Sequence, residues 1–212
     1  MTDMIDVLTH SSIRIRSTLG SIYVDPFRMR EEPHDAAFIL VTHDHYDHFS
    51  PEDVEKAGKA GTVLIVPEGM KEKAEKEAGP QFELHTVTPG SAYEIGGLKF
   101  ETVPAYNKLK PFHPKHAGWV GYILELDGLR IYIAGDTDAT KEAKLITCDI
   151  ALVPVGGTYT MDAAQAAELV NTIRPKTAIP THYGSIVGKQ DDAQIFAKQV
   201  DNAISVEIRE LY

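Results

Sequence analysis

Four potential metal ligands stand within six consecutive positions of the chain: His43, His45, Asp47 and His48. They follow the apolar run at residues 36–41, which predicts a buried strand that ends where the ligands begin. In extended backbone alternate side chains point the same way, so the first three ligands should share one face and His48 should point elsewhere. This spacing indicates ligands divided between two adjacent metal ions. The alternative is a solvated loop, but the motif uses three of the nine histidines.

The composition is that of a globular domain with a substantial core, since 43% of the 212 residues are hydrophobic and 25% are charged. We expect one domain over residues 1–212. The formal net charge of −10 argues against general nucleic-acid binding, because no basic excess is present to displace counterions. The sequence shows neither a long apolar run nor a basic leader, so we expect no membrane span and a cytoplasmic location. The single cysteine, Cys148, excludes an intramolecular disulfide and is expected in the core.

The hydrophobic pattern predicts strand-rich stretches followed by strand–helix units in both halves of the chain. Beyond residues 36–41, strands are expected at residues 5–8, 12–16, 21–24, 62–66, 84–88, 91–94, 98–103, 119–126, 129–133, 150–155, 177–180 and 205–210. Helices are expected at residues 51–57 with Ser50 as cap, 68–78, 162–173 with Thr160 as cap, and 191–200. The repeated order favours two similar layers closed face to face, with sheets inside and helices outside.

Two polar residues in the second half stand just beyond predicted strands. Asp136 follows the strand at 129–133, and His182 follows the strand at 177–180. Sites in α/β proteins collect at strand ends, where the sheet aims the side chains and the loops leave room for substrate. Taken alone, either residue would be explained as a turn or loop residue. Together with the histidine-rich motif, both become candidate metal ligands.

These motifs, in this order, resemble the metallo-β-lactamase superfamily. The nearest likeness is to its compact metal-dependent hydrolases, which include ascorbate-phosphate lactonases and relatives of N-acyl-phosphatidylethanolamine phospholipases. The residues that carry the resemblance are His43, His45, Asp47, His48, Gly135-Asp136-Thr137 and Thr181-His182, with Asp25-Pro26 and Gly156-Gly157 in support. The resemblance implies an α/β (α+β) fold, a four-layer αββα sandwich with a dinuclear site at one edge of its sheets. It also implies the ligand assignment: His43, His45 and a third histidine for one ion, Asp47, His48 and His182 for the other, and Asp136 bridging both.

The third histidine of the first ion departs from the family pattern, because Asn107 stands about where it is expected. An amide oxygen is a poor ligand for a borderline-soft ion. We expect His113 to serve instead, with His116 as the second candidate. Asn107 could hydrogen-bond a ligand or a substrate oxygen, and we include it with Lys115 among candidate substrate-binding residues.

Three histidines remain outside these motifs. His10 lies in a turn between two predicted strands, where it could approach the metal edge, and a structural hydrogen bond is its expected role. His34 and His85 are assigned to the surface or the core without a functional role.

A site of this kind would hold two divalent ions around an activated hydroxide, with zinc first and manganese, iron or nickel as alternatives. We expect hydrolysis of an ester, lactone, thioester or phosphodiester, with Asp47 as the catalytic residue that orients the hydroxide and accepts its proton. Lys108, Lys110 and Lys115 favour a small anionic substrate, although a solvated loop explains them equally well. A di-iron oxidoreductase and a non-catalytic, metal-stabilised binding module remain open, and a homo-oligomer is compatible with the sequence.

Overall fold

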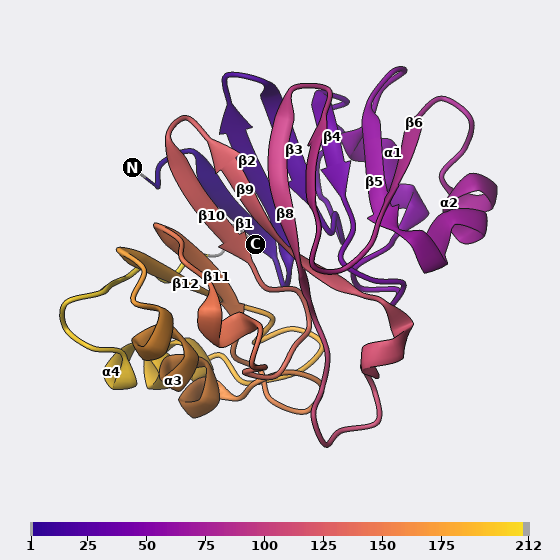
Figure 1. The fold of residues 1–212 in the computed structure, drawn as a ribbon. Helices are drawn as coiled ribbons and strands as arrows, with labels where there is room; N and C mark the ends of the chain where they lie inside the picture. Colours follow the sequence, from indigo (N-terminus) through magenta and orange to yellow (C-terminus); the bar gives the residue numbers. More distant parts are fainter. Residues whose placement is uncertain (1, 210–212) are drawn as a thin grey trace.

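Two β-sheets pack face to face and carry helices on their outer faces in the computed structural model, which describes residues 2–209 (Figure 1). The first sheet contains, in order, β1 (Ile5–Thr9), β2 (Ser12–Ser17), β3 (Gly20–Val24), β4 (Ala36–Leu40), β5 (Val63–Pro67) and β6 (Glu83–Val87). The second contains, in spatial order, β13 (Ser205–Val206), β12 (Thr177–Thr181), β11 (Ile150–Pro154), β10 (Leu129–Ile133), β9 (Val120–Leu126), β8 (Leu98–Pro104) and β7 (Ala92–Ile95). The helices are α1 (Pro51–Ala57), α2 (Lys71–Glu77), α3 (Ala163–Ile173) and α4 (Asp192–Gln199). The predicted αββα sandwich is therefore confirmed.

Each sheet joins an antiparallel part to a parallel part. Strands β1 to β3 pair antiparallel and β3 to β6 parallel, while β7 to β10 pair antiparallel and β10 to β13 parallel. This matches the order of strand-rich and strand–helix stretches in the sequence. None of the helices among the described residues is long and apolar enough to cross a membrane.

Three hydrophobic clusters hold the layers together. One lies between the two sheets, and β4 contributes Phe38 and Leu40 to it. The neighbouring residue Ile39 points to the opposite face, where it packs beneath α1 and α2. Cys148 belongs to the third cluster, beneath α3 and α4, which confirms its expected place in the core. Burial raises the pKa of its thiol to about 12, so it is not a reactive thiolate.

The predicted cap of the helix at 162–173 is wrong. Asp162 is the N-cap, since its side chain accepts a hydrogen bond from the Gln165 backbone N–H at 2.8 Å. The Gln165 side chain accepts one in return from the Asp162 N–H at 3.1 Å, which completes a capping box. Thr160 is buried instead, and its hydroxyl donates to the Gly157 carbonyl at 3.2 Å.

Two other predicted elements are shorter than expected. The helix at 68–78 begins as a 3-10 turn over Glu68–Met70 before α2 starts. The final strand, predicted at 205–210, pairs only over Ser205–Val206, and residue 210 lies outside the described residues. Both differences lie at element ends, where local pattern carries the least information.

We expect Tyr122→Phe to lower the free energy of unfolding by about 1–3 kcal/mol, because the variant removes a buried donor. Tyr122 on β9 is fully buried, and its hydroxyl donates to the Val41 carbonyl, just after β4 in the other sheet, at 2.7 Å. Urea unfolding measures the effect. Tyr46→Phe is the control, since Tyr46 is 64% exposed; equal unfolding midpoints for the two variants would contradict the assignment.

Candidate metal centre

The seven predicted metal ligands come together at the edge of the sandwich where β4, β10 and β12 end. They arrive from four separate stretches of chain: the loops after β4, β8 and β10 and the turn after β12. Because strand ends of both sheets meet at this edge, side chains far apart in the sequence become neighbours. The structure thus brings together every residue that the sequence analysis named as a ligand.

The first group contains His43, His45 and His113, whose ligand atoms lie within 4.8 Å of one another. The Nε2 atom of His43 is 3.1 Å from Nδ1 of His45 and 3.4 Å from Nε2 of His113. Ligand atoms held about 2.1 Å from one tetrahedral ion lie about 3.4 Å apart, so this spacing suits a single ion. Burial lowers the pKa of His43 well below its usual value, which favours the neutral imidazole that binds metals. His116, the second candidate, is exposed and does not join the group.

Asn107 supports His113 rather than replacing it. Its Oδ1 atom accepts a hydrogen bond from Nδ1 of His113 at 3.2 Å, and its Nδ2 atom donates to the Tyr159 carbonyl at 2.8 Å. The first bond places the proton of His113 on Nδ1 and leaves the Nε2 lone pair for an ion. Since Asn107 is buried and both ends of its amide are occupied, the structure favours this orienting role over substrate contact.

Asp136 lies between this first group and a second group, formed by Asp47, His48 and His182. One oxygen, Oδ2, is 3.4 Å from Nε2 of His113 and 3.1 Å from Nε2 of His182, while Oδ1 is 3.3 Å from Nε2 of His48. Burial raises its pKa, but the histidines His182 and His48 outweigh burial and bring the pKa well below the usual value. Gly135 before it has φ +63°, and a Cβ there would lie 3.0 Å from the Thr42 side chain. The carboxylate is therefore held in its ionised form, with one oxygen near His113 and His182 and the other near His48.

Asp25 orients His48, a role that the sequence analysis missed. One of its oxygens accepts a hydrogen bond from Nδ1 of His48 at 2.7 Å, and the other accepts one from the Thr42 N–H at 2.7 Å. The contact leaves Nε2 of His48 facing Asp136. Burial disfavours the charged imidazole, but Asp136 and Asp25 outweigh it and raise the pKa of His48 well above its usual value. The sequence signal for this role is the acid of Asp25-Pro26 at a strand end, which supports the family resemblance but does not point to His48.

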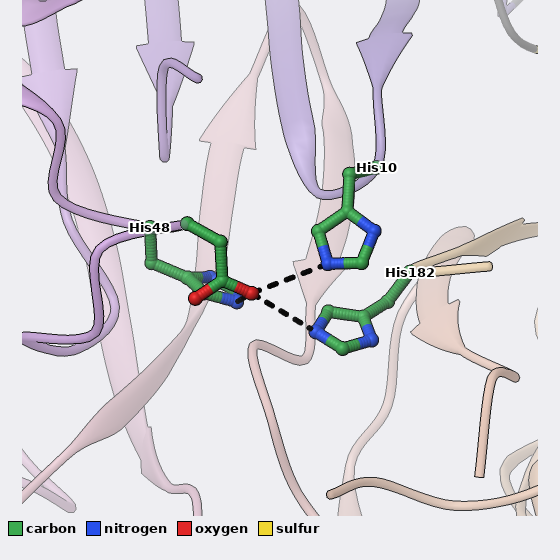
Figure 2. Close-up of side chains that lie close together, drawn as sticks. His10, His48 and His182 are labelled. Carbon is green, nitrogen blue, oxygen red and sulfur yellow. Dashed lines mark ion pairs between the residues drawn. The ribbon is translucent and has the colours of Figure 1, made fainter. Parts of the chain in front are cut away.

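The second group contains Asp47, His48 and His182, and His10 joins it. Oδ2 of Asp47 is 3.7 Å from Nε2 of His48, 3.7 Å from Nε2 of His182 and 3.3 Å from Nε2 of His10. Figure 2 shows the three imidazoles gathered around one region. The structural hydrogen bond expected of His10 is absent among the described residues. Burial lowers the pKa of His10 to about 4, so its imidazole is neutral.

The chemistry of these side chains fits bound cations. Among the described residues, the buried side-chain atoms without a hydrogen-bond partner all belong to this cluster: both ring nitrogens of His10 and of His182, Nε2 of His48 and Oδ1 of Asp136. A buried polar atom left unpaired costs about 1–3 kcal/mol, so the cluster is unfavourable without a partner. Imidazole nitrogens and carboxylate oxygens suit zinc and several other first-row ions.

A cavity of about 280 Å³ opens above the ligands. Its polar lining comes from His45, Asp47 and Asp136, and the remaining lining residues are Tyr46, Phe112, Tyr159 and Ile186. The rings of Phe112 and Tyr159 pack edge to face with centroids 4.7 Å apart. Within residues 2–209, no lysine or arginine is among the side chains that line this cavity.

Two of the three lysines in the loop between β8 and β9 are paired with acids instead. Lys110 bonds Asp138 at 2.5 Å, and Lys115 bonds Glu142 at 2.7 Å. Lys115 also stands over the Tyr106 ring at 4.8 Å and does not line the cavity. The structure therefore does not bring the predicted substrate-binding lysine to the ligands.

Comparison with known proteins identifies related sequences and structures over nearly the whole chain. A family described as a beta-lactamase superfamily domain matches residues 4–182. A UPF0173 metal-dependent hydrolase of Thermococcus onnurineus is 31% identical over 215 residues, which cover 95% of this chain and 93% of that protein. A crystal structure from Parabacteroides distasonis has a TM-score of 0.82 and 34% identity, covering 98% of this chain and 93% of that one. A metallo hydrolase from Ignicoccus hospitalis shares the fold at 22% identity, with a TM-score of 0.77 and coverage of 97% and 94%.

We expect Asp25→Asn to weaken metal binding by about 10–100-fold, because an amide cannot accept all the hydrogen bonds that orient His48. Asn tolerates the positive φ of 48° found at this position, so the backbone is retained. Competition with a chromophoric chelator measures the affinity. Asp35→Asn is the matched control, as Asp35 is an exposed acid on the surface; wild-type affinity in Asp25→Asn would refute the orienting role.

Proposed function

Because this chain belongs to the metallo-β-lactamase superfamily and is a metal-dependent hydrolase, we propose that it cleaves an ester-type bond at a two-ion site. The observation that carries the proposal is the convergence of two ligand groups on Asp136, beneath an open cavity. A solely structural metal site would have no need of such an opening, since structural sites are closed by protein ligands.

The two groups of donors support one ion in each group. The first would be held by His43, His45 and His113, the second by Asp47, His48 and His182, with Asp136 shared between them. Zinc fits these donors best, and manganese, iron and nickel fit as well. Two divalent cations bound there would supply a hydroxide at neutral pH and take up negative charge that develops on a substrate oxygen.

Asp47 is the residue that we assign to the attacking water. It lines the cavity and belongs to the second ligand group, so it can contact both an ion and the water. Burial raises its pKa, but the close contacts of its carboxylate with His10 and His182 outweigh burial and hold the pKa well below its usual value. A carboxylate of such low pKa is a weak proton acceptor. The low pKa of Asp47 therefore favours a role in orienting the water over a role in removing the proton of the water.

The walls of the cavity indicate the substrate class. Three aromatic rings and Ile186 surround the opening, and Phe112 is 43% exposed although it is a large apolar side chain. Exposed apolar side chains around a polar floor are typical of ligand sites. We therefore propose a carboxylic ester, lactone, thioester or phosphodiester that carries an apolar group beside the scissile bond. The positive charge that attracts a small anion would come from the ions rather than from lysines.

Hydrolysis is tested with zinc- or manganese-loaded protein against matched aryl and alkyl esters, lactones, thioesters and phosphodiesters. We expect turnover in at least one class, and His43→Ala should lower kcat/KM by at least about 100-fold because it removes a ligand. The melting temperature of the metal-free variant should stay near that of the metal-free wild type. His116→Ala, an exposed histidine outside the cluster, should retain wild-type kcat/KM. No turnover in any class at full metal occupancy would contradict the proposal.

Phe112→Ala should raise KM about tenfold for a substrate with a phenyl or hexyl group, because it removes part of the apolar wall. The same variant should leave KM unchanged for the corresponding methyl compound. Leu109→Ala serves as control, since Leu109 is 98% exposed and does not line the cavity. Equal changes in KM for both substrates would show that the wall does not select the apolar group.

A further inference from the structure

We propose that His10 is an additional protein ligand of the second metal ion, which then has three imidazoles beside Asp47 and Asp136. This inference rests on the proposed two-ion site and adds a residue that the family resemblance does not assign. The side chain comes from the turn between β1 and β2, whereas the predicted ligands come from the loops after β4, β8 and β10 and the turn after β12.

The first support is distance. The ligand atoms of His10, Asp47, His48 and His182 all lie within 4.8 Å of one another. The His10 Nε2 atom is 3.3 Å from Oδ2 of Asp47, which is close enough for both atoms to bind one ion at about 2.1 Å each. Figure 2 shows the imidazoles of His10 and His182 side by side, with His48 facing them. Their ring centroids are 3.9 Å apart.

The second support is the backbone that presents the ring. The pairing of β1 with β2 shifts register between Val7 and Thr9, directly before His10. Both His10 and His182 have left-handed backbone, with φ of 56° and 57°, and the His182 N–H donates to the His10 carbonyl at 2.9 Å. Bulges and left-handed non-glycine residues concentrate at functional sites because they aim side chains that regular backbone would not. The two strained turns thus hold two imidazoles against the same carboxylate.

The third support is the state of the ring nitrogens. His10 is 1% exposed, and neither of its nitrogens has a hydrogen-bond partner among the described residues. A structural histidine satisfies its ring by bonding the protein, as His34 does by donating to the Gly58 carbonyl at 2.9 Å. An ion between Nε2 of His10 and the Asp47 carboxylate, its polar neighbour at 3.3 Å, would give the ring the partner that no hydrogen bond provides.

The assignment makes the two sites unequal. The first ion would have three imidazoles and the shared carboxylate, and His45 among them is half-buried at the cavity. The second would have two carboxylates, Asp47 and Asp136, where the first has one. It would have two imidazoles without His10 and three with it. With His10 as a ligand, the second site has more protein ligands and binds its ion before the first site fills.

The experiment titrates metal-free protein with Co²⁺, following its visible absorption, and measures Zn²⁺ affinity by competition with a chromophoric chelator. Wild type should bind two ions in two steps. His10→Ala and His10→Gln should both weaken the tighter step at least tenfold and change the Co²⁺ spectrum of that step. Gln is the informative variant, because it keeps an N–H donor near the position of Nε2 but offers no imidazole nitrogen. His116→Gln, on the exposed turn, should match wild type in both readouts.

Two results would overturn the assignment while leaving the two-ion site standing. If His10→Gln keeps wild-type affinity and spectrum while His10→Ala loses them, His10 is a hydrogen-bond donor that positions Asp47. If both variants bind two ions as wild type does, His10 has neither role. Failure of the wild type itself to bind two ions would instead overturn the proposed function together with this inference. Circular dichroism of the metal-free variants verifies that each is folded.

Discussion

The mutual proximity of buried imidazoles and carboxylates is the constraint on which this structure depends. His48 and His182 lie within 3.3 Å of a buried Asp136, and several of their polar atoms have no other partner among the described residues. Burying such groups is unfavourable unless opposite charge or a ligand compensates. Hydrogen bonds hold two of the rings from the side opposite the cluster, since Asp25 bonds His48 and Asn107 bonds His113.

The two-sheet architecture explains how this cluster is assembled. Antiparallel strands begin each half of the chain, and parallel strands follow. The ends of β4 in the first sheet and of β10 and β12 in the second lie at the same edge of the sandwich. The apolar core between the sheets fixes their separation, and the Tyr122 hydroxyl ties β9 to the segment that leads into the histidine-rich motif. These contacts between the sheets hold the ligand atoms at a spacing that suits a metal ion.

Much of the fold and most of the site could be predicted from the sequence. The motif of His43 to His48 carries its chemistry in local spacing, and Asp136 and His182 stand at strand ends that hydrophobic pattern identifies. His10 and Asp25 could not be assigned in this way, because their roles arise from contacts between elements distant in sequence. Nothing in the neighbourhood of His10 indicates that its turn lies against the turn after β12.

Contacts between residues distant in sequence also explain why the lysines do not form the predicted substrate-binding patch. Their positions in the sequence suggest a basic patch, but Lys110 and Lys115 are neutralised by Asp138 and Glu142, which lie about thirty residues away. The aromatic wall, by contrast, unites Tyr46, Phe112 and Tyr159 from three loops without any shared sequence pattern. The pairing of these lysines and the composition of the cavity wall are both properties of the folded chain. Together they change the proposed substrate from a small anion to a compound with an apolar group.

Anomalous X-ray diffraction from crystals of zinc-loaded protein tests the central claim most directly. The account predicts two peaks, one among His43, His45 and His113 and the other among Asp47, His48 and His182, with the Asp136 carboxylate in contact with both. A single peak, or two peaks that Asp136 does not join, would contradict it.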